Sequence, residues 1–280
     1  MPQLIELEAR VHHLCGLQEL VRALRGIAAV RMQESLQALQ ATRRYSAAIA
    51  EAIGLAMALL PRPPAELRPV AGQERLRLVI GTEHGFVGGL GERLVEALRC
   101  APPGCGLAVA GRRTAALAID QGLSLAWSEA AAAHVGGIAA VARRLAHALG
   151  AAHSVELVYV RYLGSGRREL VVQAVVPIEA ARFDLARQGM PPLHHVAPEA
   201  LLAELAGEFL LAELAQGLTE ALTSENEARM RVMDAADRNI TEKSAHLGEE
   251  LRRLRQEAIT TELLDVITGA EAVARPGRPP

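Results

Sequence analysis

The residues best suited to chemistry form a glycine-rich run, GTEHGFVGGLGERL, at positions 81–94. The run follows an apolar stretch and opens a helical one, which is where a dinucleotide-binding loop lies in α/β proteins. Its glycines do not have GxGxxG spacing, and no GK[ST] sequence is present to hold phosphates through a lysine and a magnesium ligand. We therefore interpret the run as a tight turn with close helix packing and expect no nucleotide or other cofactor there.

Histidine, serine and cysteine side chains provide no second candidate. The pairs His12-His13 and His194-His195 have no carboxylate at metal-ligand spacing. Ser165 lacks the flanking residues of a nucleophile elbow. The cysteines form no metal pattern and are interpreted as buried or idle thiols, with a disulfide between the last two left open: Cys15, Cys100 and Cys105. The sequence therefore contains no convincing catalytic centre.

Composition restricts both the core and the partners. Half of the 280 residues are hydrophobic but only 2 % are aromatic, so the core must consist mainly of alanine, leucine and valine, as in close-packed helices. The 30 basic and 32 acidic residues give a net charge of −2, which excludes general attraction to nucleic acid or to an anionic membrane. No apolar run approaches the roughly 20 residues of a membrane span, and the charged N-terminal residues argue against a signal peptide. We expect a cytoplasmic protein.

The two ends of the chain have helical periodicity and must position whatever lies between them. No proline occurs between Gln3 and Leu60, and apolar or small residues recur there every seventh position. The stretch from Glu199 to Thr268 repeats in the same way. Helices of these lengths would measure roughly 85 and 100 Å, whereas a compact domain of this size is about 50 Å across, so they must protrude. The sequence predicts an antiparallel coiled coil of the two ends, with a bundle of shorter helices broken at glycines as the alternative.

Polar residues on the two predicted helices are of two kinds. Some interrupt the apolar seams, namely Gln18, Arg25 and Ser46 on the first helix and Asp237 and Ser244 on the last. Others are arginines on either a solvated face or a surface that contacts acidic loops of a surrounding partner: Arg22, Arg25, Arg31, Arg43, Arg44, Arg252, Arg253 and Arg255. Small residues in the middle of the first seam would let a partner helix approach closely.

Between the helices the composition changes to that of an α/β domain. Helical runs separate the first four of five apolar segments, which predicts βαβ units and a mostly parallel, Rossmann-like sheet. The turn GSGRRE at residues 164–169 predicts an antiparallel fifth strand. The predicted strands lie at residues 75–81, 106–111, 123–127, 155–162 and 170–177.

Together these segments resemble one family, the gamma subunit of F-type ATP synthases, over nearly the whole chain. The most specific match is in the closing helix, with SENEARMRVMDAADRN at residues 224–239 and RRLRQEAITTELLDVITGA at residues 252–270. The first helix is similar but looser. GTEHGFVGGL resembles the family's glycine-rich loop, with Glu83 and His84 in place of an aspartate and an arginine. These departures indicate a divergent member.

The resemblance implies a fold and a role. In the family, helices from both chain ends form an antiparallel coiled coil inside a hexamer of alternating alpha and beta subunits, and the α/β domain is a foot near the membrane ring. This implies a non-catalytic rotor, one copy per complex, that couples transmembrane ion flow to ATP synthesis or hydrolysis. Its further partners would be the epsilon subunit and the c-ring, and it would lie peripherally on the cytoplasmic side of the cell inner membrane.

The resemblance also implies site residues, none of them catalytic, metal-binding or cofactor-binding. Contact with beta-subunit loops is expected from Arg255, Gln256, Thr260, Glu262, Arg229, Arg22 and Arg31. A foot loop is expected to contain Thr82, Gly85, Gly88 and Gly89. The implied regions are a long helix at 1–60, a linker at 61–74, the foot at 75–190, a long helix at 191–270 and a flexible tail at 271–280.

Other classes of function remain open. A small-molecule enzyme could use the α/β domain, although it would lack a phosphate-cradling loop, and nucleotide titration separates it from a rotor. A plain coiled-coil scaffold is a further alternative, as is the stalk of a vacuolar-type motor. The embedded α/β domain argues against the last, because the equivalent vacuolar subunit is essentially all helical.

Overall fold

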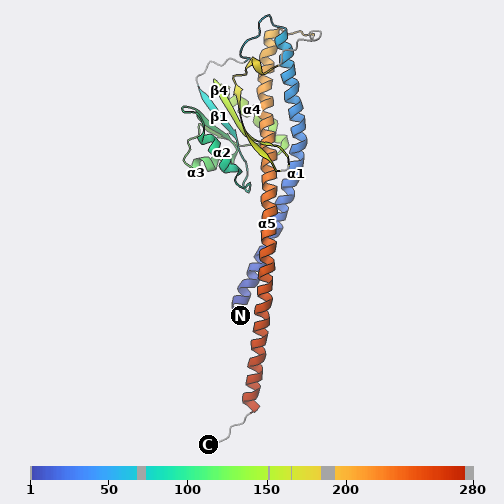
Figure 1. Ribbon diagram of the computed structural model, residues 1–280, viewed down its shortest axis with the longest axis vertical. Coiled ribbons are helices and arrows are strands. Elements are labelled where there is room, and N and C mark those ends of the chain that lie inside the picture. The colour runs from blue at the N-terminus through green and yellow to red at the C-terminus, as the bar shows by residue number, and fades with distance from the viewer. Residues whose placement is uncertain (1, 68–73, 151, 165, 184–192, 275–280) are drawn as a thin grey trace. The chain divides into compact units, whose positions relative to one another are not determined.

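The computed structural model describes residues 2–67, 74–150, 152–164, 166–183 and 193–274 (Figure 1). Two long helices, α1 (Pro2–Ala58) and α5 (Pro198–Ala274), flank a sheet with shorter helices. The chain divides into a helical unit, Met1–Gly26 with Met233–Pro280, and an α/β unit, Ile27–Val232. Parts of the predicted linker, foot, last helical region and tail, at residues 68–73, 184–192 and 275–280, lie outside the described residues.

The sheet of the α/β unit has the strand order β3-β2-β1-β4-β5. The first four strands in the chain are parallel, and the fifth pairs antiparallel with β4. This arrangement confirms the predicted mostly parallel sheet with an antiparallel fifth strand. The strands are β1 (Arg75–Ile80), β2 (Gly106–Ala110), β3 (Trp127–Glu129), β4 (Ser154–Tyr162) and β5 (Arg168–Val176).

The third strand begins later than the sequence predicts. Helix α3 (Arg112–Asp120) ends in a Schellman motif, in which Gly122 has a φ of 80° and the N–H of Leu123 donates to the carbonyl of Ala118 at 3.0 Å. Leu123 therefore still closes the helix. The first residue of the predicted 123–127 strand that pairs with β2 is Trp127, opposite Ala108. The predicted strand therefore started four residues too early, because its first residues belong to the cap of α3.

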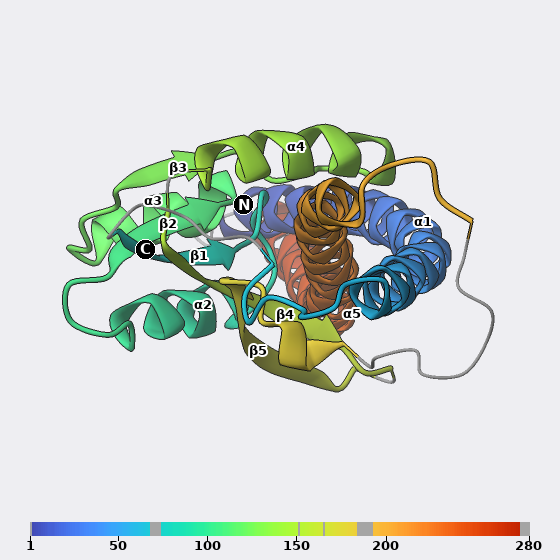
Figure 2. The same cartoon turned by 90° about the horizontal axis from the view of Figure 1, so that it is seen from above.

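Helices cover both faces of this sheet (Figure 2). On one face Leu78 packs in a core with residues of α4 (Ile138–Ala148) and α5. On the other face its neighbour Val79 packs with residues of α2 (Leu90–Arg99) and α3. Both side chains are completely buried. Because successive side chains of a strand point to opposite faces, β1 needs apolar residues at both kinds of position.

Within the α/β unit, the end of α1 packs against the start of α5. Ile53 and Met57 share a core with Leu202 and Phe209, and the Phe209 ring lies edge-on to that of Phe183 at 5.0 Å. Earlier in α1 the small seam residues are buried: Ala28 is 1 % exposed and Ser35 is 0 % exposed. Small side chains at these positions let neighbouring elements approach closely, as the seam predicts.

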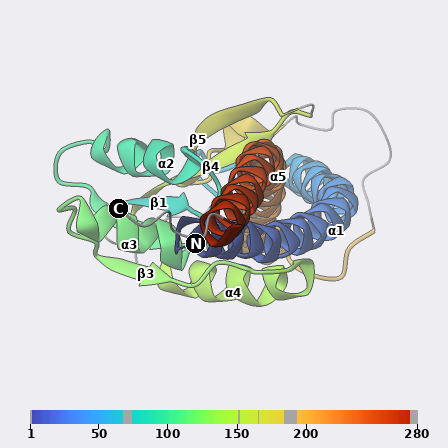
Figure 3. The same cartoon turned by 90° about the horizontal axis from the view of Figure 1, so that it is seen from below.

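In the helical unit, α1 and α5 run antiparallel (Figure 3). Glu8 pairs with Arg255, and Arg25 pairs with Asp234, so numbers rise on one helix as they fall on the other. Both helices are continuous, which confirms the pair of long helices and excludes a bundle broken at glycines. The buried seam residues in this unit are Leu7, Val21, Met233 and Ile240.

Candidate interaction sites

Four of the predicted contact residues lie on the last turns of α5, in the helical unit. Arg255 forms an ion pair with Glu8 (Nη2–Oε1 2.6 Å), yet its side chain is still 54 % exposed. Gln256, Thr260 and Glu262 are exposed, and the Thr260 hydroxyl donates to the Gln256 carbonyl at 2.8 Å. Neither Gln256 nor Glu262 has a side-chain partner within the described part of the chain. These residues form a polar surface that another chain could bind.

The same end of α5 also exposes apolar side chains. They are between 54 % and 69 % exposed, and they are Ile259, Leu263, Leu264, Val266 and Ile267. A run of exposed large apolar side chains on one helix is typical of an interaction surface. The last turns of α5 therefore combine polar groups, which can form directional hydrogen bonds with a partner, and apolar groups, which can pack against it without fixed direction.

Polar seam residues of the helical unit bind one another. Asp237 Oδ1 accepts hydrogen bonds from Gln18 Nε2 at 2.9 Å and from Arg22 Nε at 3.0 Å. Gln18 Nε2 also donates to Thr241 Oγ1 at 2.9 Å. The Gln18 hydrogen bond, together with the bond and charge of Arg22, lowers the pKa of Asp237. Gln18 and Asp237, which interrupt the two seams, are therefore partners, and such a polar contact can fix the register of two helices.

The two predicted contact arginines of α1 have different surroundings. Arg22 remains 59 % exposed while it binds Asp237. Arg31 belongs to the α/β unit, is partly buried, and has no carboxylate partner among the residues described. Each therefore keeps part of its guanidinium free for another molecule.

The glycine-rich run forms the loop between β1 and α2, here called the foot loop (residues 81–89). Its base is buried: the N–H of Thr82 donates to Thr114 Oγ1 at 2.8 Å. The Glu83 carboxylate accepts the backbone N–H groups of Arg112 at 3.1 Å and Ala131 at 2.8 Å. These bonds tie the loop to the start of α3 and to the chain after β3. Glu83, which stands where the family has an aspartate, is thus buried and anchors the loop.

Glu225 of α5 holds the middle of the foot loop. Its carboxylate accepts the backbone N–H groups of Glu83 at 2.9 Å and His84 at 3.2 Å. Arg229 donates to Glu225 at 2.6 Å and to the Gly85 carbonyl at 3.1 Å, and its side chain is only 10 % exposed. Burial would raise the pKa of Glu225, but the bonds from His84 and Arg229 and the Arg229 charge lower it overall. Arg229 therefore binds the loop rather than presenting a free cation.

The outer part of the foot loop is presented to solvent. Phe86 is 68 % exposed and has a φ of 61°, which is rare for a residue other than glycine. Gly88 also has a φ of 61°, and Gly89 is the N-cap of α2. Such a backbone conformation persists only where the surroundings hold it, and here the N–H groups of Glu83 and His84, just before Phe86, donate to the Glu225 carboxylate.

A basic hollow of about 430 Å³ adjoins the foot loop. Arg93, Arg168 and Arg231 line it together with loop residues. Arg168 and Arg231 both pair with Glu227, whose side chain is 3 % exposed. Three guanidinium groups thus line the hollow and two of them share a single carboxylate, so the hollow keeps a net positive charge.

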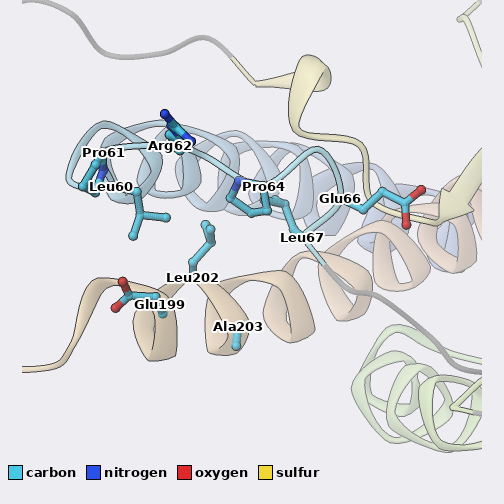
Figure 4. A pocket seen from close by; sticks show the side chains of 9 residues that line it. All are labelled: Leu60, Pro61, Arg62, Pro64, Glu66, Leu67, Glu199, Leu202 and Ala203. Carbon is cyan, nitrogen blue, oxygen red and sulfur yellow. The ribbon is translucent and has the colours of Figure 1, made fainter.

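A second, mainly apolar hollow of about 580 Å³ lies in the α/β unit where α1 ends and α5 begins (Figure 4). Leu60 and Leu67 line it from the segment after α1, and Leu202 lines it from the first turns of α5. Arg62 and Glu199 add polar groups. This end of the unit therefore also offers a concave surface.

The described residues contain neither a metal site nor a membrane-spanning helix. No group of three or more His, Cys, Asp or Glu side chains there could hold a metal ion, and no helix there is long and apolar enough to cross a membrane. The thiols are free; Cys15 and Cys100 are exposed, and burial raises the pKa of the partly buried Cys105.

Sequence reasoning missed several buried carboxylates on α5. Glu213 and Glu220 are 8 % and 0 % exposed, yet an acidic residue in a helix resembles a solvated one when only the sequence is seen. Glu225 was singled out only through the family motif. Arg43, the partner of Glu220, was read as one cation among several on α1. The available signal was weak, because spacing alone does not show which arginine reaches which carboxylate.

Comparisons with known proteins identify the class. Residues 3–273 match a family model described as ATP synthase. ATP synthase gamma chains of Moorella thermoacetica and Fuscovulum blasticum are 26 % identical over 289 residues and 28 % identical over 295 residues. Each alignment covers 98 % of this chain and 100 % of the relative. A chain of the Euglena gracilis mitochondrial ATP synthase has the same fold, with a TM-score of 0.68 at 15 % identity over 99 % of this chain and 97 % of that one.

The chain therefore belongs to the ATP synthase gamma chain family. Its function is that of the central-stalk subunit, a non-catalytic rotor part of the ATP synthase. This result confirms the family and the function that the sequence resemblance implied.

Proposed function

We propose that one copy of this chain rotates inside a hexamer of alternating alpha and beta subunits and couples transmembrane ion flow to ATP synthesis or hydrolysis. Its further partners are the epsilon subunit and the membrane c-ring, and it lies peripherally on the cytoplasmic side of the cell inner membrane. The similar Euglena chain belongs to an assembly of OSCP, F1 and c-ring. A similar Tetrahymena thermophila chain, with a TM-score of 0.55, belongs to a central stalk with its c-ring. These assemblies support the proposed partners.

The observation that carries this proposal is the exposed end of α5. Polar groups on it, at Arg255, Gln256, Thr260 and Glu262, bind loops of the beta subunits in the proposed complex. The apolar side chains at residues 259–267 face the surrounding alpha-beta hexamer. Apolar contacts are non-directional, so they allow the coiled coil to turn inside the hexamer. Arg22 and Arg31 supply further cations to the same partners. None of these contacts requires chemistry from the chain itself.

The foot loop has a related role in the proposal. Gly85, Gly88 and Gly89 shape its outer face, while Thr82 fixes its base. Arg229 takes part in partner contact through the loop that it holds, because its guanidinium is bonded to Glu225 and Gly85. The adjoining basic hollow favours an acidic surface on the partner.

The test is to co-express the tagged chain with the alpha and beta subunits of its host, purify through the tag, and measure subunit stoichiometry and ATP hydrolysis. We expect one copy of this chain for three alpha-beta pairs, and hydrolysis that depends on its presence. Purification of the chain alone, as an oligomer without alpha or beta subunits, would overturn the proposal. A variant with Arg143→Gln, an exposed arginine of α4 with no side-chain partner among the described residues, controls for loss of surface charge.

An enzyme that binds a nucleotide in the α/β unit is the rival function. Glu83 and the Thr82–Thr114 pair fill the base of the foot loop, where a phosphate would otherwise lie. We therefore expect nucleotide titration of the purified chain to detect no tight binding. A saturable site of micromolar affinity on the chain alone would favour the rival.

A further inference from the structure

Glu220, on α5 in the α/β unit, joins three elements of the fold. Its Oε1 accepts a hydrogen bond from Arg43 Nη2 of α1 at 2.5 Å. Its Oε2 accepts the backbone N–H of Tyr162, at the end of β4, at 3.0 Å. The carboxylate is completely buried, although Arg43 itself is half exposed. One oxygen thus binds the other long helix, and the second oxygen binds the sheet.

Glu213 repeats this arrangement two helical turns earlier. Its Oε1 accepts from Ser46 Oγ of α1 at 3.1 Å, and its Oε2 accepts from Gln173 Nε2 of β5 at 2.8 Å. Arg182 Nη2 lies 3.5 Å from the same Oε2. Again one oxygen binds α1 and the other binds the sheet. We call the two arrangements the Glu213 junction and the Glu220 junction.

The sequence between the two junctions brings α5 close to the sheet. A separation of seven residues places both carboxylates on one face of the helix. Gly217 lies between them, and a Cβ atom there would lie 2.8 Å from Ile80 Cδ1 of β1. Figure 2 shows α5 next to α1 and next to strands β4 and β5 of the sheet. The two junctions therefore stand where all three elements meet.

Directional contacts at such a point resist twisting in a way that apolar contacts do not. Apolar packing is non-directional, so one surface can slide over another with little loss. A hydrogen bond weakens steeply when its angle changes. Separation of a buried carboxylate from its donors also leaves an uncompensated charge in the interior. A twist of α5 against the sheet would strain both junctions at once.

We propose that Glu213 and Glu220 are positioning residues that transmit torque between the two long helices and the α/β unit. The inference rests on the proposed rotary function, in which force generated along the helices must reach the foot. The apolar core holds the elements together, and the two junctions set their angle. Removal of one junction leaves α1, α5 and the sheet folded, but it lets α5 twist more easily against the other two.

The experiment uses the assembled complex, held to a surface through its beta subunits. A bead is attached at Cys100, which is exposed in the α/β unit, after Cys15→Ser and Cys105→Ser exchanges. The angular fluctuation of the resting bead reports the stiffness between the helices and the foot. The test variant is Glu220→Gln, which keeps the side-chain shape but cannot accept from both Arg43 and Tyr162. The matched control is Glu204→Gln, an exposed carboxylate on α5 with no partner among the described residues.

We expect Glu220→Gln to widen the angular distribution of the bead relative to Glu204→Gln. It should also lower the largest ion gradient that ATP hydrolysis builds in vesicles, while hydrolysis in the presence of an ionophore stays at the control value. A role limited to stability would change the melting temperature but not the angular width of complexes that assemble. An angular width equal to that of the control would overturn the proposal.

Ser46→Ala gives a second, milder variant that removes only the α1 bond of the Glu213 junction. If Glu220→Gln does not assemble, this variant decides the question: a wider distribution supports the proposal, and an unchanged one overturns it. The proposed function is judged separately on the unaltered chain. Failure of that chain to assemble and rotate would refute the rotor, whereas normal rotation with unchanged stiffness in the variants would refute only the torque role.

Discussion

The backbone N–H of Glu83 donates a hydrogen bond to the carboxylate of Glu225 at 2.9 Å, although the two residues are 142 positions apart. The same carboxylate accepts the N–H of His84 and binds Arg229, which in turn binds the Gly85 carbonyl. The conformation of the foot loop therefore depends on one acidic side chain of α5. This dependence leads to two predictions about stability.

Glu225→Gln should lower the free energy of unfolding by about 3 kcal/mol, because it leaves the nearly buried Arg229 without its counter-charge. Urea unfolding of the purified chain measures the change. Glu204→Gln, on the exposed side of the same helix, is the matched control and should have almost no effect. A loss for Glu225→Gln no larger than that of the control would show that the loop does not depend on this carboxylate.

The contribution of Glu225 should also depend on pH. Its pKa in the folded chain is lowered from the ordinary value of 4.5. A group of this kind stabilises the fold fully above its unfolded pKa, and the stabilisation is lost as pH falls through the folded pKa. The difference in unfolding free energy between the unaltered chain and Glu225→Gln should therefore shrink below about pH 4.5. A difference that stays constant from neutral to acidic pH would contradict this assignment.

Substitution of Arg255 and Gln256 together by alanine should weaken assembly with the alpha and beta subunits or reduce coupling. Stability of the chain alone should hardly change, because the Arg255–Glu8 pair is solvent-exposed and such pairs contribute at most about 1 kcal/mol. The measurement is ATP-driven ion pumping by the purified complex, with Arg143→Gln on α4 as the control. Unchanged pumping in the double variant would count against the contact role of these two residues.

Gly81→Ala should destabilise the α/β unit, whereas Gly85→Ala should not. A Cβ atom at Gly81 would lie 2.5 Å from the Thr114 side chain, but one at Gly85 would meet nothing within 4 Å. Overpacking of a closed site costs about 1–3 kcal/mol. Thermal unfolding of both variants tests the difference. Equal melting temperatures would mean that the loop base adapts more easily than its bonds indicate.

Ser35→Leu should destabilise the chain by a similar amount, about 1–3 kcal/mol, since Ser35 is completely buried on α1. Its exposed neighbour Gln33 provides the control, and Gln33→Leu should leave the unfolding free energy almost unchanged. Urea unfolding distinguishes the two variants. A tolerated leucine at position 35 would show that the close approach of elements at this point is not needed for stability.

The long helices and the sheet could be predicted because their signals are repeated many times. Each long helix contains no proline after its first residue and has a seven-residue repeat. Each central strand is an apolar run between helical runs. The third strand was misplaced because the Schellman motif at Gly122 and Leu123 uses apolar residues that also suit a strand. Periodic patterns thus predict elements well, whereas single caps decide their ends.

The candidate sites were less predictable, for a different physical reason. The exposed residues at the end of α5 could be singled out through family resemblance, but the burial of Arg229 could not. Burial depends on which loop lies over a helix, and the bonds of Arg229 to the foot loop join residues 144 positions apart. Asp237 similarly interrupts a seam in the sequence, yet in the fold it is the partner of Gln18 and Arg22.

The seven-residue step between Glu213 and Glu220 also restricts how this chain can change over evolution. One inserted or deleted residue between them would turn one carboxylate by about 100° around α5 and separate it from both of its partners. The side chains between the two positions can vary within the limits of packing, but their number cannot. Length changes among relatives should therefore be absent from residues 213–220 and collect in surface loops, such as the one that precedes α4.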